Sequence, residues 1–304
     1  MARVGHGCSI SKASIFIWLL CALTFYALFN IAVRNSSEWS ISYSEKRLRL
    51  YDKMERDLEE HGAGFLKHGE TSQSLSLSDL FSLKDGIVTP VLKDANPPVR
   101  ANVLHLGIEY SVHISEAVRT IFSPYFDKAI WFQNSSRYHC SMFHASHHAR
   151  PVPASEAEIE AEADAVKTLA EGLCPLNVVL DRVILTSTGV LVGCWQVISG
   201  TDPVIIRDRL RNALPHAPEK QFYDAVILHT SFARLLGPPT FPEEAKKSSV
   251  LEFFKILVSK LNSEIRGLKA TMSELWYVEE HHLLALAIDG SMKIRKFPLG
   301  CLKA

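Results

Sequence analysis

The sequence lacks an excess of charge of either sign. Its 304 residues include 33 lysines and arginines and 33 aspartates and glutamates, so the formal net charge is zero. Domains that bind nucleic acid or an anionic surface through a broad electrostatic field carry a basic excess. The balance therefore excludes a strong nucleic-acid surface, and a phosphate-bearing ligand would have to be recognised locally.

Cysteine is scarce as well, with six residues in the chain. Cys8 and Cys21 belong to the N-terminal region, and the other four are Cys140, Cys174, Cys194 and Cys301. Their spacings match no zinc-binding pattern. We expect buried thiols, and one disulfide remains open if the domain folds in an oxidising compartment.

One long hydrophobic run is present. Residues 13–33 contain no charged side chain, and as a helix they would span roughly 30 Å, the thickness of the hydrocarbon core of a bilayer. A cleaved signal peptide has a shorter apolar core and a small-residue cleavage site, so a transmembrane signal anchor fits better.

The orientation of this anchor is not decided by its flanking charges, because basic residues lie on both sides. A 12-residue tail before the span and a large domain after it suit a type II protein of the Golgi or endoplasmic reticulum with a lumenal domain. Asn35-Ser36-Ser37 and Asn134-Ser135-Ser136 are N-glycosylation sequons, which have meaning only in the lumen.

The sequence predicts four parts: a tail at 1–12, the anchor at 13–33, a stem and linker at 34–95, and a domain at 96–304. Ser42 and Glu45 have capping-box spacing and predict the start of a stem helix, which Gly62 would end. Pro97 and Pro98 indicate a break before the domain.

Helix and strand patterns alternate through this domain, and the order strand, helix, strand, strand occurs twice. Ser155 and Glu158 also have capping-box spacing and predict the start of a helix. A hairpin is expected about residues 187–189, a helix is expected to begin at Asp202-Pro203, and residues 282–288 are expected to form a strand. We predict an α+β fold with two pseudo-symmetric lobes. Each lobe would have antiparallel strands and outer helices, and the lobes would enclose a central cleft.

Two short motifs occupy the strands that open these lobes, His139-Cys140-Ser141-Met142 and His229-Thr230-Ser231-Phe232. In a strand, residues i and i+2 share a face, so each histidine lies beside its serine. If the strands lie side by side, one neutral imidazole can take a proton, one imidazolium can give a proton, and the serines can bind phosphate oxygens.

These paired motifs resemble those of the two-histidine (2H) phosphoesterase superfamily, the RNA 2′-5′ ligase and cyclic phosphodiesterase group. The second is the closer match, since "HTSFAR" is similar to the family's H-x-T-Φ-A-R. The region about 100–297 also resembles plant membrane-anchored proteins described as RNA ligase/cyclic nucleotide phosphodiesterase-like.

This resemblance implies catalytic roles for His139 and His229, phosphate binding by Ser141 and Ser231, and hydrolysis of a cyclic or 2′-5′ phosphodiester without a metal or other cofactor. Arg234 matches the family's arginine, but strict strand alternation would put it on the face opposite His229.

Other interpretations of the same residues remain. His144, His147 and His148 could bind a metal, but a rim loop is expected, because prolines follow them and a fourth ligand is missing. His281 and His282, beside Glu279 and Glu280, are expected in a solvated hairpin. The domain could also be a catalytically silent, membrane-tethered module that binds a small phosphorylated or nucleotide-type ligand or acts as a scaffold.

Overall fold

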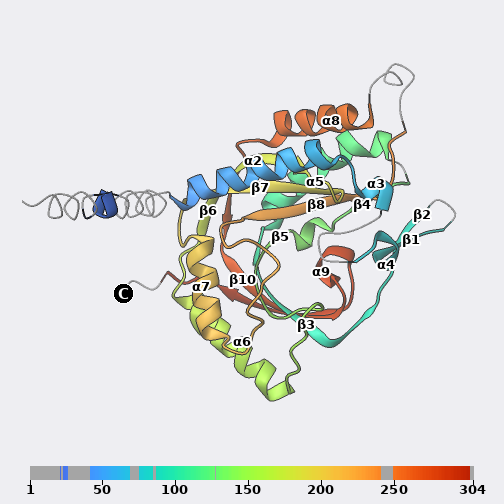
Figure 1. Cartoon of the computed structure of the whole chain (residues 1–304). Coiled ribbons are helices and arrows are strands. Elements are labelled where there is room, and N and C mark those ends of the chain that lie inside the picture. The colour runs from blue at the N-terminus through green and yellow to red at the C-terminus, as the bar shows by residue number, and fades with distance from the viewer. Residues whose placement is uncertain are drawn as a thin grey trace, which may run out of the picture. The chain divides into compact units, whose positions relative to one another are not determined.

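The structure is a computed structural model, and it describes Cys21 and residues 23–26, 42–68, 75–84, 87–126, 128–240 and 249–301 (Figure 1). The anchor predicted at 13–33 lies almost wholly outside these ranges. Within them, no helix has the length and apolar character needed to cross a membrane. The chain divides into two compact units, Met1–Glu45 and Lys46–Ala304.

The second unit is an α+β structure whose sheets are antiparallel. One sheet has the strand order β11-β10-β3-β5, with bounds Met292–Pro298, Glu274–His282, Asp94–His105 and His139–Ser146. The other has the order β4-β8-β7-β6-β9, with bounds Ile130–Phe132, His229–Leu235, Val190–Ser199, Leu176–Leu185 and Lys269–Met272. A separate pair joins β1 (Phe81–Lys84) to β2 (Ile87–Pro90).

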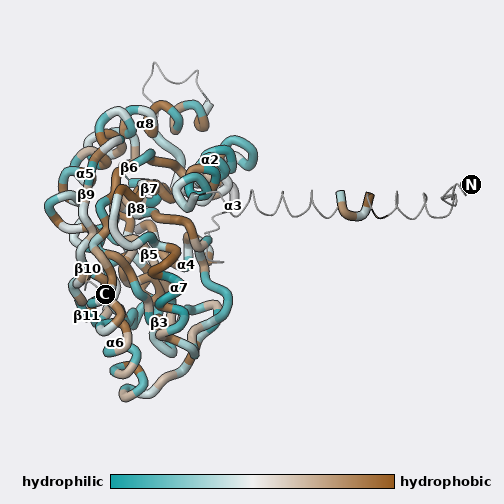
Figure 2. The backbone as a smooth tube through the Cα atoms, turned by 90° about the vertical axis from the view of Figure 1, so that its left-hand side faces the viewer, coloured by the Kyte–Doolittle hydropathy of each residue, from teal (hydrophilic) through white to brown (hydrophobic). Residues whose placement is uncertain are grey.

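Helices pack on both large sheets. α6 (Glu156–Glu171) contacts β10 and β11, and α7 (Pro203–Ala213) contacts β5. α5 (Ile108–Phe122) and α8 (Val250–Ile265) contact each other and the five-stranded sheet. The remaining short helices are α3 (Phe65–His68), α4 (Leu77–Leu80), α9 (Ala285–Ile288), η1 (Ser123–Tyr125) and η2 (Ser135–Arg137). Figure 2 shows hydrophobic residues concentrated on the central strands.

Local signals in the sequence account for most of these elements. Ser155 and Glu158 form the predicted capping box at the start of α6. The Asp202 side chain accepts a hydrogen bond from the N–H of Val204 at the start of α7. The β6–β7 hairpin turns at Gly189, whose φ of 83° favours glycine. These three predictions are confirmed.

The pairing of the strands differs from the expected lobes. The β6–β7 hairpin follows β5 in the sequence but pairs with β8, and the β10–β11 hairpin pairs with β3. Each large sheet therefore takes strands from both halves of the domain, and the repeated order of elements does not divide the sheets into consecutive halves.

Two local predictions are wrong. Residues 285–288, expected in a strand, form the helix α9, whose buried Leu286 packs with β3 and β10. Pro97 and Pro98, expected to mark a break, lie within β3. β3 accommodates them because its register with β10 assigns no partners to residues 95–98, so no ladder hydrogen bond is lost there.

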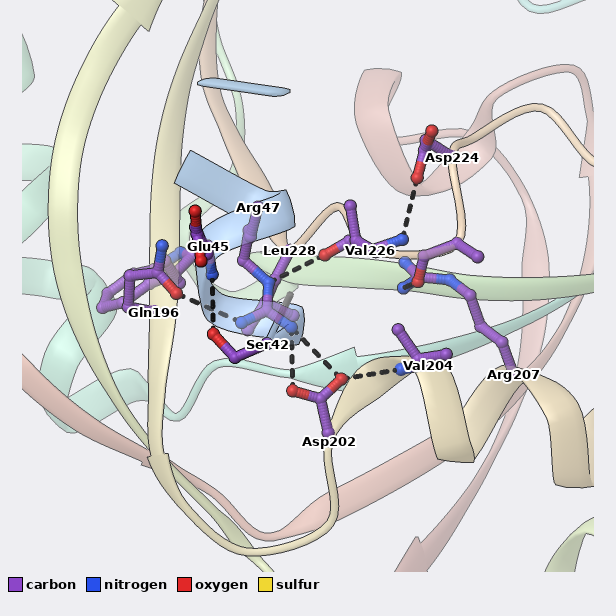
Figure 3. A network of polar contacts seen from close by, with 12 residues as sticks. Ser42, Glu45, Arg47, Gln196, Asp202, Val204, Arg207, Asp224, Val226 and Leu228 are labelled. Atoms are coloured by element: carbon purple, nitrogen blue, oxygen red, sulfur yellow. Dashed lines mark hydrogen bonds and ion pairs between the residues drawn. The ribbon is translucent and has the colours of Figure 1, made fainter. Parts of the chain in front are cut away.

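The predicted stem helix is α2 (Tyr43–His61), and the N–H of Glu45 donates to Ser42 Oγ as its capping spacing predicts. From Lys46 onward, α2 belongs to the larger compact unit, so this unit begins well before residue 96. Arg47 is fully buried, and its guanidinium donates to Val226 O at 2.7 Å, to Gln196 and to Asp202 (Figure 3). The structure thus corrects the idea that the whole helix is a separate stem.

The cysteines of the domain follow the expectation of buried thiols with one disulfide. Cys140 and Cys194 are buried free thiols. Cys174 and Cys301 form a disulfide that joins the segment before β6 to the residues after β11.

Candidate active site

A single pocket of about 330 Å³ brings both H-x-S motifs together. His139 and Ser141 on β5 line it together with His229 and Ser231 on β8, and Arg234 lines it too. The structure therefore places all five predicted site residues at one cavity. Its volume lies near the lower end of the range found for small-molecule pockets.

The strands that carry the motifs are held together on the side opposite the pocket. Cys140 and Thr230, the central residues of the two motifs, are buried and share a hydrogen bond of 3.3 Å between Sγ and Oγ1. The indole N–H of Trp195 donates to the same Thr230 hydroxyl at 3.1 Å. Because neighbouring residues point to opposite faces, this contact directs both histidines and both serines toward the pocket.

A β-bulge explains why Arg234 joins them. Ser231 pairs with Val192 and Ala233 pairs with Leu191, so Phe232 is an extra residue in β8. The carbonyl of Phe232 accepts a hydrogen bond from the N–H of Gln133 at 3.0 Å. An extra residue shifts the side-chain alternation by one position, so Arg234 faces the pocket. The expectation from strict alternation is wrong.

β5 also contains a β-bulge, at the same point of its motif. Ser141 pairs with Val103 and Phe143 pairs with Asn102, so Met142 is the extra residue. The buried guanidinium of Arg207 donates to the carbonyls of Ser141 and Met142 and thereby supports this bulge. His144 consequently lines the pocket in the position that corresponds to Arg234.

Two of the three clustered histidines differ from the expected rim loop, whereas His148 lies in a partly exposed turn. His144 belongs to β5 and is buried, and burial lowers its pKa to about 3. His147 is buried as well, and its ring lies 4.2 Å from the Phe222 ring. In the part of the chain that the structure describes, no three histidine, cysteine or acidic side chains gather in a way that could hold a metal ion.

His139 has a defined proton arrangement. Its Nδ1 lies 2.8 Å from the carbonyl oxygen of Arg137, and a carbonyl can only accept, so Nδ1 carries the hydrogen. In the neutral ring, Nε2 is then the basic nitrogen. Burial lowers the pKa of His139, although the bond to Arg137 acts in the opposite direction.

His229 is also held in the neutral form. Burial, the nearby charge of Arg207 and the proximity of His139 lower its pKa to about 4. Its ring contacts Tyr223 edge to face, with the ring centroids 5.0 Å apart. The pocket therefore presents two unprotonated imidazoles at neutral pH.

Arg234 supplies a cation. Burial lowers its pKa to about 10, which leaves the guanidinium charged at pH 7. Its Nη1 is buried and has no hydrogen-bond partner among the described residues. A buried charge without a partner is costly, so an anion in this pocket would be bound favourably.

Glu280 is a site residue that the sequence reasoning missed. It lines the pocket and is 5% exposed, and Glu279 is 7% exposed, although both stand beside the two histidines expected in a solvated hairpin. Of those histidines, His281 is exposed, and β10 continues to His282. A signal was present, since Glu280 has the same parity as Trp276 and Val278, two apolar residues of the same strand.

These features define an α+β protein with antiparallel sheets and a pocket, where β5 and β8 meet, that carries both H-x-S motifs. No family model and no curated protein matches the sequence. Two solved structures are similar. The protein TT0787 of Thermus thermophilus has 13% identity and a TM-score of 0.46, with 67% of this chain and 100% of that chain covered. The conserved protein of unknown function ATU0111 from Agrobacterium tumefaciens has 12% identity and a TM-score of 0.49, with 73% and 92% covered.

Proposed function

We propose that the protein is a membrane-anchored 2H-type phosphodiesterase that hydrolyses a cyclic or 2′-5′ phosphodiester by acid/base catalysis with His139 and His229. The observation that supports this most is the convergence of two H-x-S motifs, from separate sheets, on one pocket that also holds the charged Arg234. No cofactor enters this proposal. The two bulged strands would be the equivalent walls of two pseudo-symmetric lobes.

The proposed reaction opens a phosphodiester with water. One imidazole accepts a proton from the water as its oxygen forms a bond to phosphorus. The other imidazole, protonated, gives its proton to the departing alkoxide oxygen as the P–O bond breaks. Ser141, Ser231 and Arg234 would donate hydrogen bonds to the non-bridging oxygens, whose charge increases in the transition state.

Both histidines have a lowered pKa, yet the reaction needs one imidazolium. A bound phosphodiester anion supplies this condition, because a nearby negative charge favours the protonated ring and raises its pKa. Proton uptake would then accompany substrate binding.

We further propose that the domain is lumenal, with residues 13–33 as a type II anchor in the Golgi or endoplasmic reticulum. The disulfide between Cys174 and Cys301 supports an oxidising compartment, because such bonds are rare in the cytosol. The sequon at Asn134 lies in a partly exposed turn, η2 and its flanks, where a glycan can be accommodated.

A second candidate function is a binding module without turnover. Two neutral imidazoles beside a charged guanidinium can hold a phosphate group without transferring a proton. In that case the ligand would bind with an affinity that depends on Arg234, and no product would form.

Hydrolysis of 2′,3′-cyclic nucleotides and of 2′-5′-linked dinucleotides by the full chain, in detergent and with a chelator present, separates the two candidates. His139→Ala and His229→Ala should each reduce the rate by roughly 10²- to 10⁴-fold. His113→Ala is a matched control, because His113 also has serine two residues later but is exposed on α5. Binding without hydrolysis by the wild type would favour the binding module.

A further inference from the structure

Two acidic side chains line the pocket, Asp57 on α2 and Glu280 on β10, and the surroundings of Glu280 differ from those of the histidines. Glu280 lies near the end of β10, and the pocket is also lined by Leu284, Leu286 and Ala287, which follow β10, and by Ala101 on the adjacent strand β3. Except for the carboxyl group, this wall is apolar. The polar wall with the two motifs comes from β5 and β8, so the pocket has two chemically different sides.

One oxygen of Glu280 is occupied and fixed. Oε1 accepts a hydrogen bond from the backbone N–H of Leu286 at 2.7 Å. That is the only hydrogen bond of this carboxyl group among the described residues, and no arginine or lysine forms an ion pair with it there. Oε2 is therefore left to face the cavity that Glu280 lines.

The adjacent Glu279 shows the contrast. Its carboxylate bonds to Arg295, and Lys293 lies 4.0 Å away, so its charge is balanced on the other face of the sheet. Burial raises the pKa of Glu280 to about 7, which reflects a carboxyl group in an apolar wall without a cation beside it. A buried acidic group kept without a protein partner is suited to a ligand that provides one.

We propose that Glu280 selects the ligand: its Oε2 accepts a hydrogen bond from an N–H or O–H group on the organic part of the phosphorylated molecule whose phosphate lies at the two motifs. This inference rests on the proposed function, because it assumes that phosphate occupies the polar wall. It extends that function by giving the ligand a second, donor-bearing end that reaches the apolar wall.

Glu280→Gln is a sharp test because the Leu286 N–H fixes how the new side chain can sit. The amide oxygen of glutamine must accept that bond, so the amide NH₂ would face the cavity in place of an acceptor. Size and packing stay the same while the hydrogen-bonding character of the cavity wall is reversed. Glu279→Gln is the matched control on the same strand.

The measurement is calorimetric binding of three probes to the full chain: inorganic phosphate, cytidine 3′-monophosphate and uridine 3′-monophosphate. We expect Glu280→Gln to leave the affinity for inorganic phosphate unchanged and to weaken the affinity for both nucleotides or for one of them by roughly 10- to 100-fold. A loss confined to cytidine would assign the donor to its amino group, a loss confined to uridine would assign it to the ring N3–H, and an equal loss for both would assign it to a ribose hydroxyl; each of these results supports the proposal.

Unchanged nucleotide binding in Glu280→Gln, with phosphate still bound, would overturn the role of Glu280 while leaving the proposed function intact. If the wild type binds the nucleotides no more tightly than inorganic phosphate, the role of Glu280 is overturned as well. If the wild type binds none of the three probes, the phosphate site fails and the inference fails with it.

Discussion

The hydroxyl of Tyr51 on α2 bonds to the residue that directly precedes the second motif. Removing this hydroxyl tests how much the helix stabilises that motif. It donates toward the carbonyl oxygens of Leu228 and Trp195 at 2.7 and 2.8 Å, and it receives the N–H of Leu228 at 3.2 Å. In Tyr51→Phe, the Leu228 carbonyl keeps the N–H of Trp195 at 2.9 Å, but the Leu228 N–H loses its partner. Tyr51 and Leu228 are both fully buried, so water cannot replace the bond.

An unsatisfied buried donor costs about 1–3 kcal/mol, and we expect Tyr51→Phe to lower the free energy of unfolding by that amount. Because Leu228 directly precedes His229, turnover should fall as well. Equilibrium urea unfolding followed by tryptophan fluorescence measures the first effect. Tyr43→Phe, at a tyrosine on the same helix that is 41% exposed, is the control. A Tyr51→Phe protein within about 0.5 kcal/mol of wild type would refute the reasoning, since changes of that size are ordinary for surface sites.

Three more predictions follow from the site and the disulfide. Arg234→Met should weaken inorganic phosphate binding by at least roughly 10-fold without lowering stability, because an unpaired buried cation is removed; calorimetry that shows wild-type affinity would contradict the assignment. The pKa of His229 is about 4 in the folded state against an ordinary 6.5, so the unfolded chain binds a proton first, and the free energy of unfolding should fall as the pH drops from 6.5 toward 4. In His229→Gln, urea unfolding across this range should show a smaller fall in the free energy of unfolding. An equal pH dependence in the variant and the wild type would disprove this. Reduction of the Cys174–Cys301 bond, which spans a separation of 127 residues, should cost about 4–5 kcal/mol by the chain-entropy model, and no change in the urea midpoint on reduction would contradict this.

Much of the secondary structure could be predicted because its signals are local. The start of α6 depends on Ser155 and Glu158, three residues apart, and the β6–β7 turn depends on Gly189. Which strands pair is a long-range property. Nothing near β6 or β7 in the sequence indicates that their partner would be β8 and not the preceding β5.

The motif residues were predictable, but their neighbours were less so. His139, Ser141, His229 and Ser231 follow from a period of two in short strands, and the structure places them together. Arg234 could not be placed by the same rule. A bulge adds a residue without leaving a composition signal, and Phe232 reads as an ordinary apolar strand residue.

The burial of Glu279 and Glu280 was not predicted either, because it also involves contacts outside their own strand. Glu279 and Glu280 with two following histidines form a polar run, which usually indicates solvent. Their burial accompanies the pairing with β11, the ion pair with Arg295 and the bond from the N–H of Leu286, none of which the polar run itself indicates.

Each hairpin pairs with a strand from the other half of the domain, and this pairing has a consequence for biosynthesis. β10 is the neighbour of β3 in the four-stranded sheet, yet it is synthesised about 170 residues after β3 has emerged. Until then β3 lacks its partner on one edge, and an unpaired strand edge can pair with other chains. A chain that stops before residue 274 would lose two of the four strands, the Glu280 carboxyl and the disulfide partner Cys301 at once, so a late frameshift should be as damaging as an early one.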